Sequence, residues 1–204
     1  MTNSIATPRR VTNELLHVAV TCRGKTPLLM NRVSEEELLK IRDKVKAPKG
    51  APRPAPREEC EKKVYVDLDG KPYLPVNMLY SCLVAAGQHV RLDGKKQIST
   101  AKSTALPTFL TLDDTSIALN APKPWEVDLR QGRNPNGGEL VVLCRPRFDE
   151  WAFTVNITID TRQIAEMTMR ELFDIAGVRC GLGDFRPNRK GIFGQFLIEK
   201  WERD

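Results

Sequence analysis

The chain has few aromatic residues, only two histidines and no long hydrophobic run. Aromatic side chains make up 6% of its 204 residues, and hydrophobic side chains make up 41%. No apolar stretch reaches the roughly 18 residues that a membrane-spanning helix requires, and residues 1–10 are polar where a secretory signal would have its apolar region. We therefore expect a globular, cytoplasmic protein with no membrane partner.

Paired cysteines and familiar catalytic motifs are also missing. The cysteines are scattered and form no C-x-x-C pair, which argues against a zinc site and against a disulfide framework. The sequence contains no G-x-x-x-x-G-K-[ST] phosphate loop, no G-x-S-x-G and no H-E-x-x-H. We expect no metal, no other cofactor, and buried thiols at Cys22, Cys60, Cys82, Cys144 and Cys180.

The two histidines make only a weak case for catalysis. His17 falls on a predicted strand face, from which it could act as a general base on a ribose 2′-hydroxyl, but a single histidine there is more often a surface residue. His89 lies at the end of a predicted helix, after Gly87, and would interact with the helix C-terminus. The acidic pair Asp113 and Asp114 is more typical of a turn or a surface than of a metal site. We therefore lean against enzymatic activity.

Positive charge exceeds negative charge along the chain. Lysine and arginine number 32 against 26 aspartates and glutamates, which gives a formal net charge of +6 and a pI near 9.1. Most of the excess lies in predicted loops. This balance favours an anionic partner such as nucleic acid, although charge alone would also serve solubility.

Hydrophobic periodicity predicts strands and helices in the order βαββαβ. Strands with one buried face alternate apolar and polar residues, whereas helices repeat their apolar residues at intervals of three and four. The predicted elements are a strand over 14–22, a helix over 75–90, strands over 105–112 and 151–160, a helix over 162–176 and a strand over 193–201. This order predicts an α+β, ferredoxin-like (RRM-like) fold.

The remaining residues are interpreted as additions to one domain that covers residues 1–204. Ser34 and Glu37 form a capping box that predicts a helix to about Val45, and Asp69-Gly70 predicts a hairpin turn. Residues 122–138 are interpreted as an irregular finger. The expected parts are core segments at about 14–30, 64–119 and 139–201, insertions at about 31–63 and 120–138, and a basic N-terminal tail over 1–12.

The stretch from Gly181 to Phe196 carries the strongest functional signal. Its glycines surround three cations between a predicted helix and a predicted strand. Because glycine accepts positive φ, such a loop can direct main-chain N–H groups at an anion while the cations add full charges. The alternative is a tight connection whose glycines serve only chain reversal. The residues that we expect to bind phosphates here are Gly181, Gly183, Arg186, Arg189, Lys190, Gly191 and Gly194.

Further cations extend this candidate site. Arg23 and Lys25 lie at the end of the first predicted strand, and Arg130 and Arg133 lie in the predicted finger. Because few aromatic residues are left over for stacking on bases, we expect contacts mainly to the phosphate backbone, with little dependence on base sequence.

Three segments resemble the RAMP superfamily of CRISPR-associated proteins. The first strand runs into Thr26-Pro27-Leu28-Leu29, the Lys71-Pro72-Tyr73-Leu74-Pro75 segment precedes a helix, and a glycine-rich loop spans Gly181 to Phe196. Two features depart from the family pattern. Val76, Asn77 and Met78 stand where the family prefers glycine and serines, and the loop ends in G-x-x-G instead of G-x-G.

The resemblance implies a ferredoxin-like fold, a glycine-rich loop that contacts RNA, and assembly with other subunits along a guide RNA. It fits a divergent, phage- or plasmid-borne relative of the backbone subunits. Our leading hypothesis is a non-catalytic protein that binds single-stranded nucleic acid, with RNA favoured over DNA, and that self-associates or joins a multisubunit ribonucleoprotein. One alternative is a phage-encoded decoy that mimics such a subunit, as an anti-CRISPR protein would. Another is a ferredoxin-like enzyme acting on a phosphorylated small molecule.

Overall fold

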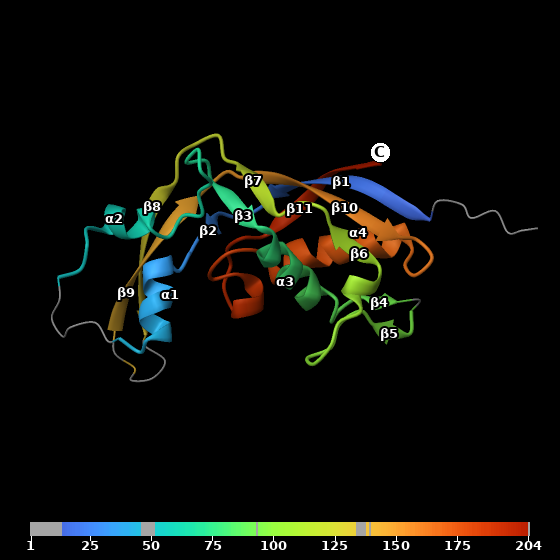
Figure 1. Ribbon diagram of the computed structural model, residues 1–204, viewed down its shortest axis with the longest axis horizontal. Helices are drawn as coiled ribbons and strands as arrows, with labels where there is room; N and C mark the ends of the chain where they lie inside the picture. The colour runs from blue at the N-terminus through green and yellow to red at the C-terminus, as the bar shows by residue number, and fades with distance from the viewer. Residues whose placement is uncertain (1–13, 46–51, 93, 134–137, 139, 204) are drawn as a thin grey trace, which may run out of the picture.

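The computed structural model describes residues 14–45, 52–92, 94–133, 138 and 140–203 (Figure 1). The predicted basic tail over residues 1–12 lies outside these ranges. The same holds for residues 46–51 and for the Asn136-Gly137 dipeptide. Within them, no helix has both the length and the apolar character that crossing a membrane would require.

An antiparallel sheet contains the predicted strands. Its members are β1 (Leu15–Gly24), β3 (Tyr73–Pro75), β6 (Leu110–Leu112), β7 (Ser116–Asn120), β10 (Ala152–Asp160) and β11 (Phe196–Arg203). β1 pairs with β10 on one side and with β11 on the other. The far edge of β10 pairs with β6 and β7, and β3 lies beyond β7. This strand order confirms the predicted ferredoxin-like, α+β fold.

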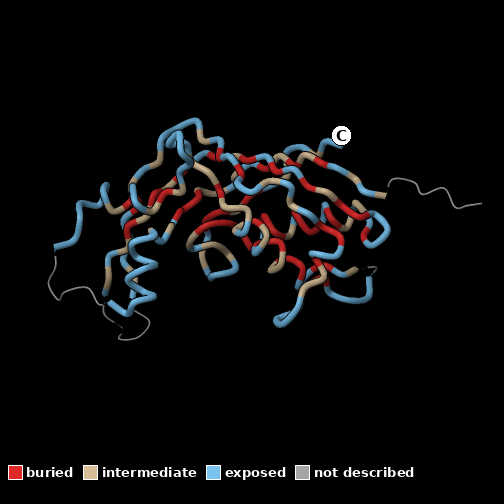
Figure 2. Tube along the Cα trace, viewed as in Figure 1, coloured by how far each residue is buried: buried red, intermediate tan, exposed pale blue. Residues whose placement is uncertain are grey.

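The helices α3 (Val76–Ala86) and α4 (Glu166–Ile175) cover one face of this sheet (Figure 1). Buried residues gather between the sheet and these helices (Figure 2). Phe153 and Phe196 pack edge to face, with ring centroids 5.5 Å apart, and Phe173 of α4 is also fully buried. Burying a side chain of this size stabilises the fold by about 1.5–3 kcal/mol. The alternating pattern of β10 therefore fixes which face of the sheet the helices cover.

Several boundaries differ from the sequence-based prediction. The predicted strand over 105–112 is a short 3₁₀-helix, η1 (Leu106–Thr108), followed by β6. The predicted hairpin around Asp69-Gly70 turns as expected, but only a single bridge between Val66 and Pro72 precedes β3. The strands β4 (Arg91–Leu92) and β5 (Lys96–Gln97) pair with each other as a small hairpin.

The predicted irregular finger over 122–138 was wrong, because Glu126–Arg133 form a strand of a second sheet. This sheet has the order β2 (Leu28–Leu29), β9 (Leu140–Phe148) and β8 (Glu126–Arg133). Two short helices, α1 (Glu35–Arg42) and α2 (Pro56–Glu61), lie beside it in Figure 1. The predicted capping box of Ser34 and Glu37 is confirmed at the start of α1.

Gly177 does not end the second core helix, contrary to the prediction. The chain continues past α4 into a π-helical turn, η2 (Ala176–Cys180). A Cβ atom on Gly177 would lie 2.1 Å from the carbonyl oxygen of Phe196. Glycine is needed there because the helix and β11 approach each other too closely for any side chain.

The glycine-rich stretch that follows is bonded through its main chain to the β1–β2 connection. Asp184 N donates to Leu29 O at 2.8 Å, and Gly194 N donates to Pro27 O at 2.8 Å. Leu182 N also donates to Gly194 O at 2.9 Å, which closes the base of the loop. A Cβ atom on Gly194 would lie 1.8 Å from Leu182 O. This glycine is therefore required by packing as well as by its φ of +69°.

Two glycine substitutions separate these requirements. Gly94 and Gly194 have almost the same φ, +70° and +69°, but a Cβ atom on Gly94 would have no neighbour within 4 Å. We expect Gly94→Ala to lower the free energy of unfolding by about 1 kcal/mol, because alanine disfavours positive φ. Gly194→Ala should lower it by a further 1–3 kcal/mol or so, because of the clash. Urea denaturation of both variants measures the difference, and equal losses would show that the loop base is loosely packed.

Candidate nucleic-acid interface

The predicted site residues divide into a buried base and an exposed tip. Gly181, Gly183 and Gly194 are buried and have positive φ, whereas Arg189 and Lys190 are exposed. A short 3₁₀-helix, η3 (Pro187–Arg189), forms the tip. The glycines thus shape the loop, and the cations project from it.

Most main-chain N–H groups of the loop are not available for the predicted anion site. Leu182, Asp184, Gly191, Phe193 and Gly194 all donate their N–H groups to carbonyl oxygens of the protein. An N–H group that already donates to a carbonyl is not free to bind a phosphate. Anion binding by this loop therefore depends on the side chains of its tip.

The tip holds its cations in a defined main-chain conformation. Arg186 is half-buried, and its Nη1 donates to Gly183 O at 2.7 Å. Lys190 and Phe185 have φ values of +61° and +53°, which residues with a Cβ adopt only when the surrounding structure imposes them. Gly191 makes this possible, because a Cβ atom there would lie 1.6 Å from Phe185 O. Arg189 and Lys190 are therefore presented to solvent from an ordered turn.

The second sheet supplies the next cations. The Arg130 guanidinium lies 4.3 Å from the centre of the Phe193 ring, in cation–π geometry. Arg145 donates from Nε to Asp184 Oδ2 at 2.6 Å. These contacts place β8 and β9 directly beside the loop. Arg130 therefore lies next to the predicted loop site, although the sequence alone could not show that the two are neighbours. Arg133 is exposed at the far end of β8.

Two of these arginines are already engaged by acids. Arg130 forms a bidentate pair with Asp128, whose hydrogen bond raises the pKa of the guanidinium. Arg145 was not singled out from the sequence, since its partner Asp184 is 39 residues away. A phosphate would have to compete with Asp128 for Arg130 and with Asp184 for Arg145. Among the residues that the structure describes, no carboxylate pairs with Arg189 or Lys190.

Arg23 and Lys25 lie at the other end of the loop. Lys25 is exposed, and its main-chain N–H donates to Gln195 O at 2.7 Å, next to Gly194. Arg23 lies on the open face of the sheet, with Nε 3.6 Å from Glu199 Oε1. The structure therefore places Lys25 beside the loop, while Arg23 is partly neutralised by its neighbour.

The open face of the sheet carries a hydrogen-bonded cluster that includes two aspartates. Sequence reasoning missed this cluster. Thr158 Oγ1 lies 2.9 Å from His17 Nδ1 and donates to Asp113 at 2.9 Å. Asp114 accepts the main-chain N–H of Asn156 at 2.7 Å. The only sequence signal was the Asp113-Asp114 pair, which was interpreted as a turn. Its negative charge makes this face a poorer surface for phosphates than the loop tip.

Few aromatic side chains are presented for stacking on bases. Trp125 is covered by the Arg57 guanidinium, 3.7 Å from the ring centre. Trp201 packs against Phe173 and donates to Glu166. Of these three aromatic rings, that of Phe185 is the best placed to stack on a base, because it is 45% exposed at the loop tip.

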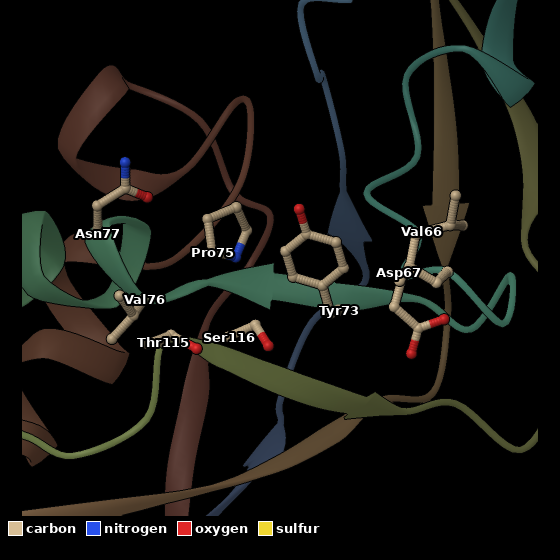
Figure 3. A pocket seen from close by; sticks show the side chains of 9 residues that line it. Val66, Asp67, Tyr73, Pro75, Val76, Asn77, Thr115 and Ser116 are labelled. Atoms are coloured by element: carbon tan, nitrogen blue, oxygen red, sulfur yellow. The ribbon is translucent and has the colours of Figure 1, made fainter.

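An open pocket of about 620 Å³ lies at the N-terminus of α3. Figure 3 shows Tyr73, Pro75 and Asn77 projecting on the same side of the β3–α3 junction. Asp67, the pocket's carboxylate, accepts the N–H groups of Asp69 and Lys71. Its lining residues are Val66, Asp67, Leu68, Tyr73, Pro75, Val76, Asn77, Thr115 and Ser116. The titratable side chains in this lining are those of Asp67 and Tyr73.

No group of three or more His, Cys, Asp or Glu side chains is arranged to hold a metal ion in the part of the chain that the structure describes. All five cysteines are buried, as predicted. The loop tip itself carries guanidinium and ammonium groups, which can bind phosphates.

Comparisons with known proteins extend these observations. No protein-family model and no curated protein matches this sequence. One similar solved structure is described as the cryo-EM structure of the Type III-B Cmr-beta bound to cognate target RNA, with a TM-score of 0.57 and 13% identity. The match covers 93% of this chain and 60% of the other. The crystal structure of Cmr6 from Pyrococcus furiosus gives a TM-score of 0.48 and 12% identity, over 90% and 98% of the two chains.

At these identities the likeness concerns the fold alone, and the chain spans about 60% of the length of the Cmr-beta chain. It nevertheless agrees with the resemblance seen in the sequence. The chain has a distant RAMP-like fold.

Proposed function

We propose that this chain binds single-stranded RNA as one subunit of a multisubunit ribonucleoprotein, as a divergent relative of the RAMP backbone subunits. The observation that carries the proposal is the loop tip, where a buried glycine scaffold presents Arg189 and Lys190 to solvent. The similar Cmr-beta structure is of a complex bound to target RNA, which supports the same class of ligand here.

The RNA path follows the cations around the loop. Lys25 lies at one end of the loop, next to Gln195. Arg130 lies over the ring of Phe193. These guanidinium and ammonium groups on the surface attract phosphates, and a contact to a phosphate carries no base specificity. Phe185 adds one exposed ring on which a base can stack. Binding is therefore tolerant of sequence and strongly electrostatic.

Assembly is supported by apolar side chains that this chain leaves uncovered. The apolar side chains of α1 lie in solvent, and no residue of this helix is buried. Ile41 is 68% exposed and, with Val45, lines an open hollow of about 340 Å³. Several large apolar side chains exposed together on a charged helix favour a contact with another protein. We assign this face to contact with a neighbouring subunit along the RNA.

Salt dependence tests the electrostatic mechanism. If about four phosphates are contacted, raising the salt from about 50 to about 200 mM should weaken binding of a single-stranded RNA by about 50-fold. Fluorescence anisotropy with a labelled oligonucleotide measures the dissociation constant at each salt concentration. Affinity that stays constant across this range would exclude the proposed phosphate contacts.

Removal of the exposed tip cations tests the site. Arg189→Ala with Lys190→Asn removes two charges and keeps a residue that tolerates positive φ at position 190. We expect RNA binding at least about tenfold weaker, and a plot of log affinity against log salt shallower by about 1.4, since two phosphate contacts are lost.

The matched control takes the same number of charges from the β4–β5 hairpin. Lys95 and Lys96 are exposed there, at the opposite end of the molecule from the second sheet (Figure 1). Lys95→Ala with Lys96→Ala should leave both the affinity and the salt slope nearly unchanged. If the two double variants weaken binding equally, the effect is one of net charge and the loop is not the site.

A charge placed on α1 tests the assembly surface. Wild-type protein should form species larger than one chain when mixed with RNA, and Ile41→Glu should reduce them by placing a carboxylate in an apolar contact. Light scattering after size-exclusion chromatography measures the mass. Met167→Glu is the control, because Met167 is 76% exposed on α4, away from this surface. A wild-type complex with a single protein chain would contradict self-assembly along RNA.

A further inference from the structure

Two buried thiols meet where the α2 segment attaches to the β8–β9 hairpin. Cys60 lies on α2 and Cys144 on β9, and their Sγ atoms are 2.8 Å apart. The two residues are 0% and 2% exposed. They are separated by 84 positions in the sequence, so the fold alone brings them together. A sulfur separation of this size is within about 1 Å of a disulfide bond.

The α2 segment is otherwise held to the hairpin by peripheral contacts. Arg53 donates to Val142 O at 3.2 Å, and the Arg57 guanidinium lies over the Trp125 ring. Cys144 Sγ donates to Pro56 O at 3.1 Å. Cys60 is the only buried residue of the helix. A segment with so few buried contacts opens locally, which gives small solutes access to both thiols.

We propose that Cys60 and Cys144 form a reversible disulfide by exchange with a small-molecule disulfide such as oxidised glutathione. One protein thiolate attacks the glutathione disulfide, forming a mixed disulfide and releasing one glutathione thiol. The second protein thiolate then attacks the protein sulfur of the mixed disulfide and releases the other glutathione. Two protein thiols are oxidised, one disulfide is reduced to two thiols, and a dithiol reductant reverses the reaction.

The surroundings of the pair set the rate of this exchange. Burial, together with the hydrogen bond to Cys144, raises the pKa of the Cys60 thiol to about 12. Since the thiolate is the reacting species, exchange is slow at neutral pH and accelerates as the pH rises. Lys63 moderates this effect, because its Nζ lies 2.9 Å from Cys144 O and its charge favours the Cys60 thiolate.

The crosslink would attach α2 covalently to the hairpin that contacts the glycine loop. It closes a long loop in the unfolded chain, which lowers the entropy of that state and stabilises the folded one. The proposal is independent of RNA binding, because neither thiol lies among the cations of the loop tip.

The test starts from reduced wild-type protein, incubated with excess oxidised glutathione at mildly alkaline pH and then freed of it. We expect the thiol count of the denatured protein to fall from five by two, and a non-reduced peptide map to show Cys60 joined to Cys144. The urea midpoint of the oxidised protein should rise, and dithiothreitol should return it to the starting value. Cys144→Ser should abolish both the crosslink and the rise.

Three results would overturn the proposal. The first is a folded wild-type protein that retains all five thiols after prolonged incubation. The second is a stable glutathione adduct on Cys60 with Cys144 still free, which would show that the pair cannot close. The third is a crosslink that maps to other cysteines, such as Cys82 and Cys180. Because each outcome is scored on wild-type protein, the result does not depend on whether the Cys144→Ser variant folds.

Discussion

The structure depends on the main-chain contact between the glycine-rich loop and the residues that connect β1 to β2. Gly194 bonds to Pro27, and Asp184 bonds to Leu29. Pro27 follows the main sheet, and Leu29 belongs to the second sheet, so these bonds join the two. They require that two stretches of backbone approach without side chains between them. A Cβ atom on Gly183 would lie 2.3 Å from Leu29 O, which shows how little space remains.

This contact explains why the glycines and the cations of one loop have different roles. A glycine at positive φ is equally consistent with an anion-binding turn and with close packing, so its presence in the sequence could not decide between them. The structure decides, because the amides of Leu182, Asp184 and Gly194 are bonded within the protein. What remains for a ligand is the tip, whose position is fixed by the same bonds.

Strong hydrophobic alternation made the main sheet predictable, and its absence concealed the second sheet. β10 has a large apolar residue at every inward position, so its register and its paired helix followed from the sequence. In β8 the buried position belongs to Asp128, which is 5% exposed and paired with Arg130 and Arg147. A strand whose inward residue is a carboxylate gives no period-two signal. The contact of Arg130 with Phe193 was unpredictable for the same reason, since it depends on this strand.

The ion pairs of the second sheet also bear on where a polyanion binds. Asp128 is buried, and removing its arginine partners would leave an uncompensated charge, which costs far more than an exposed pair contributes. A phosphate that drew Arg130 away from Asp128 would therefore lose part of its binding energy to that cost. Arg189 and Lys190 can be neutralised by a phosphate without breaking such a pair. In the binding mode that we propose, binding energy therefore concentrates at the loop tip, and the neighbouring arginines hold the loop and add long-range attraction.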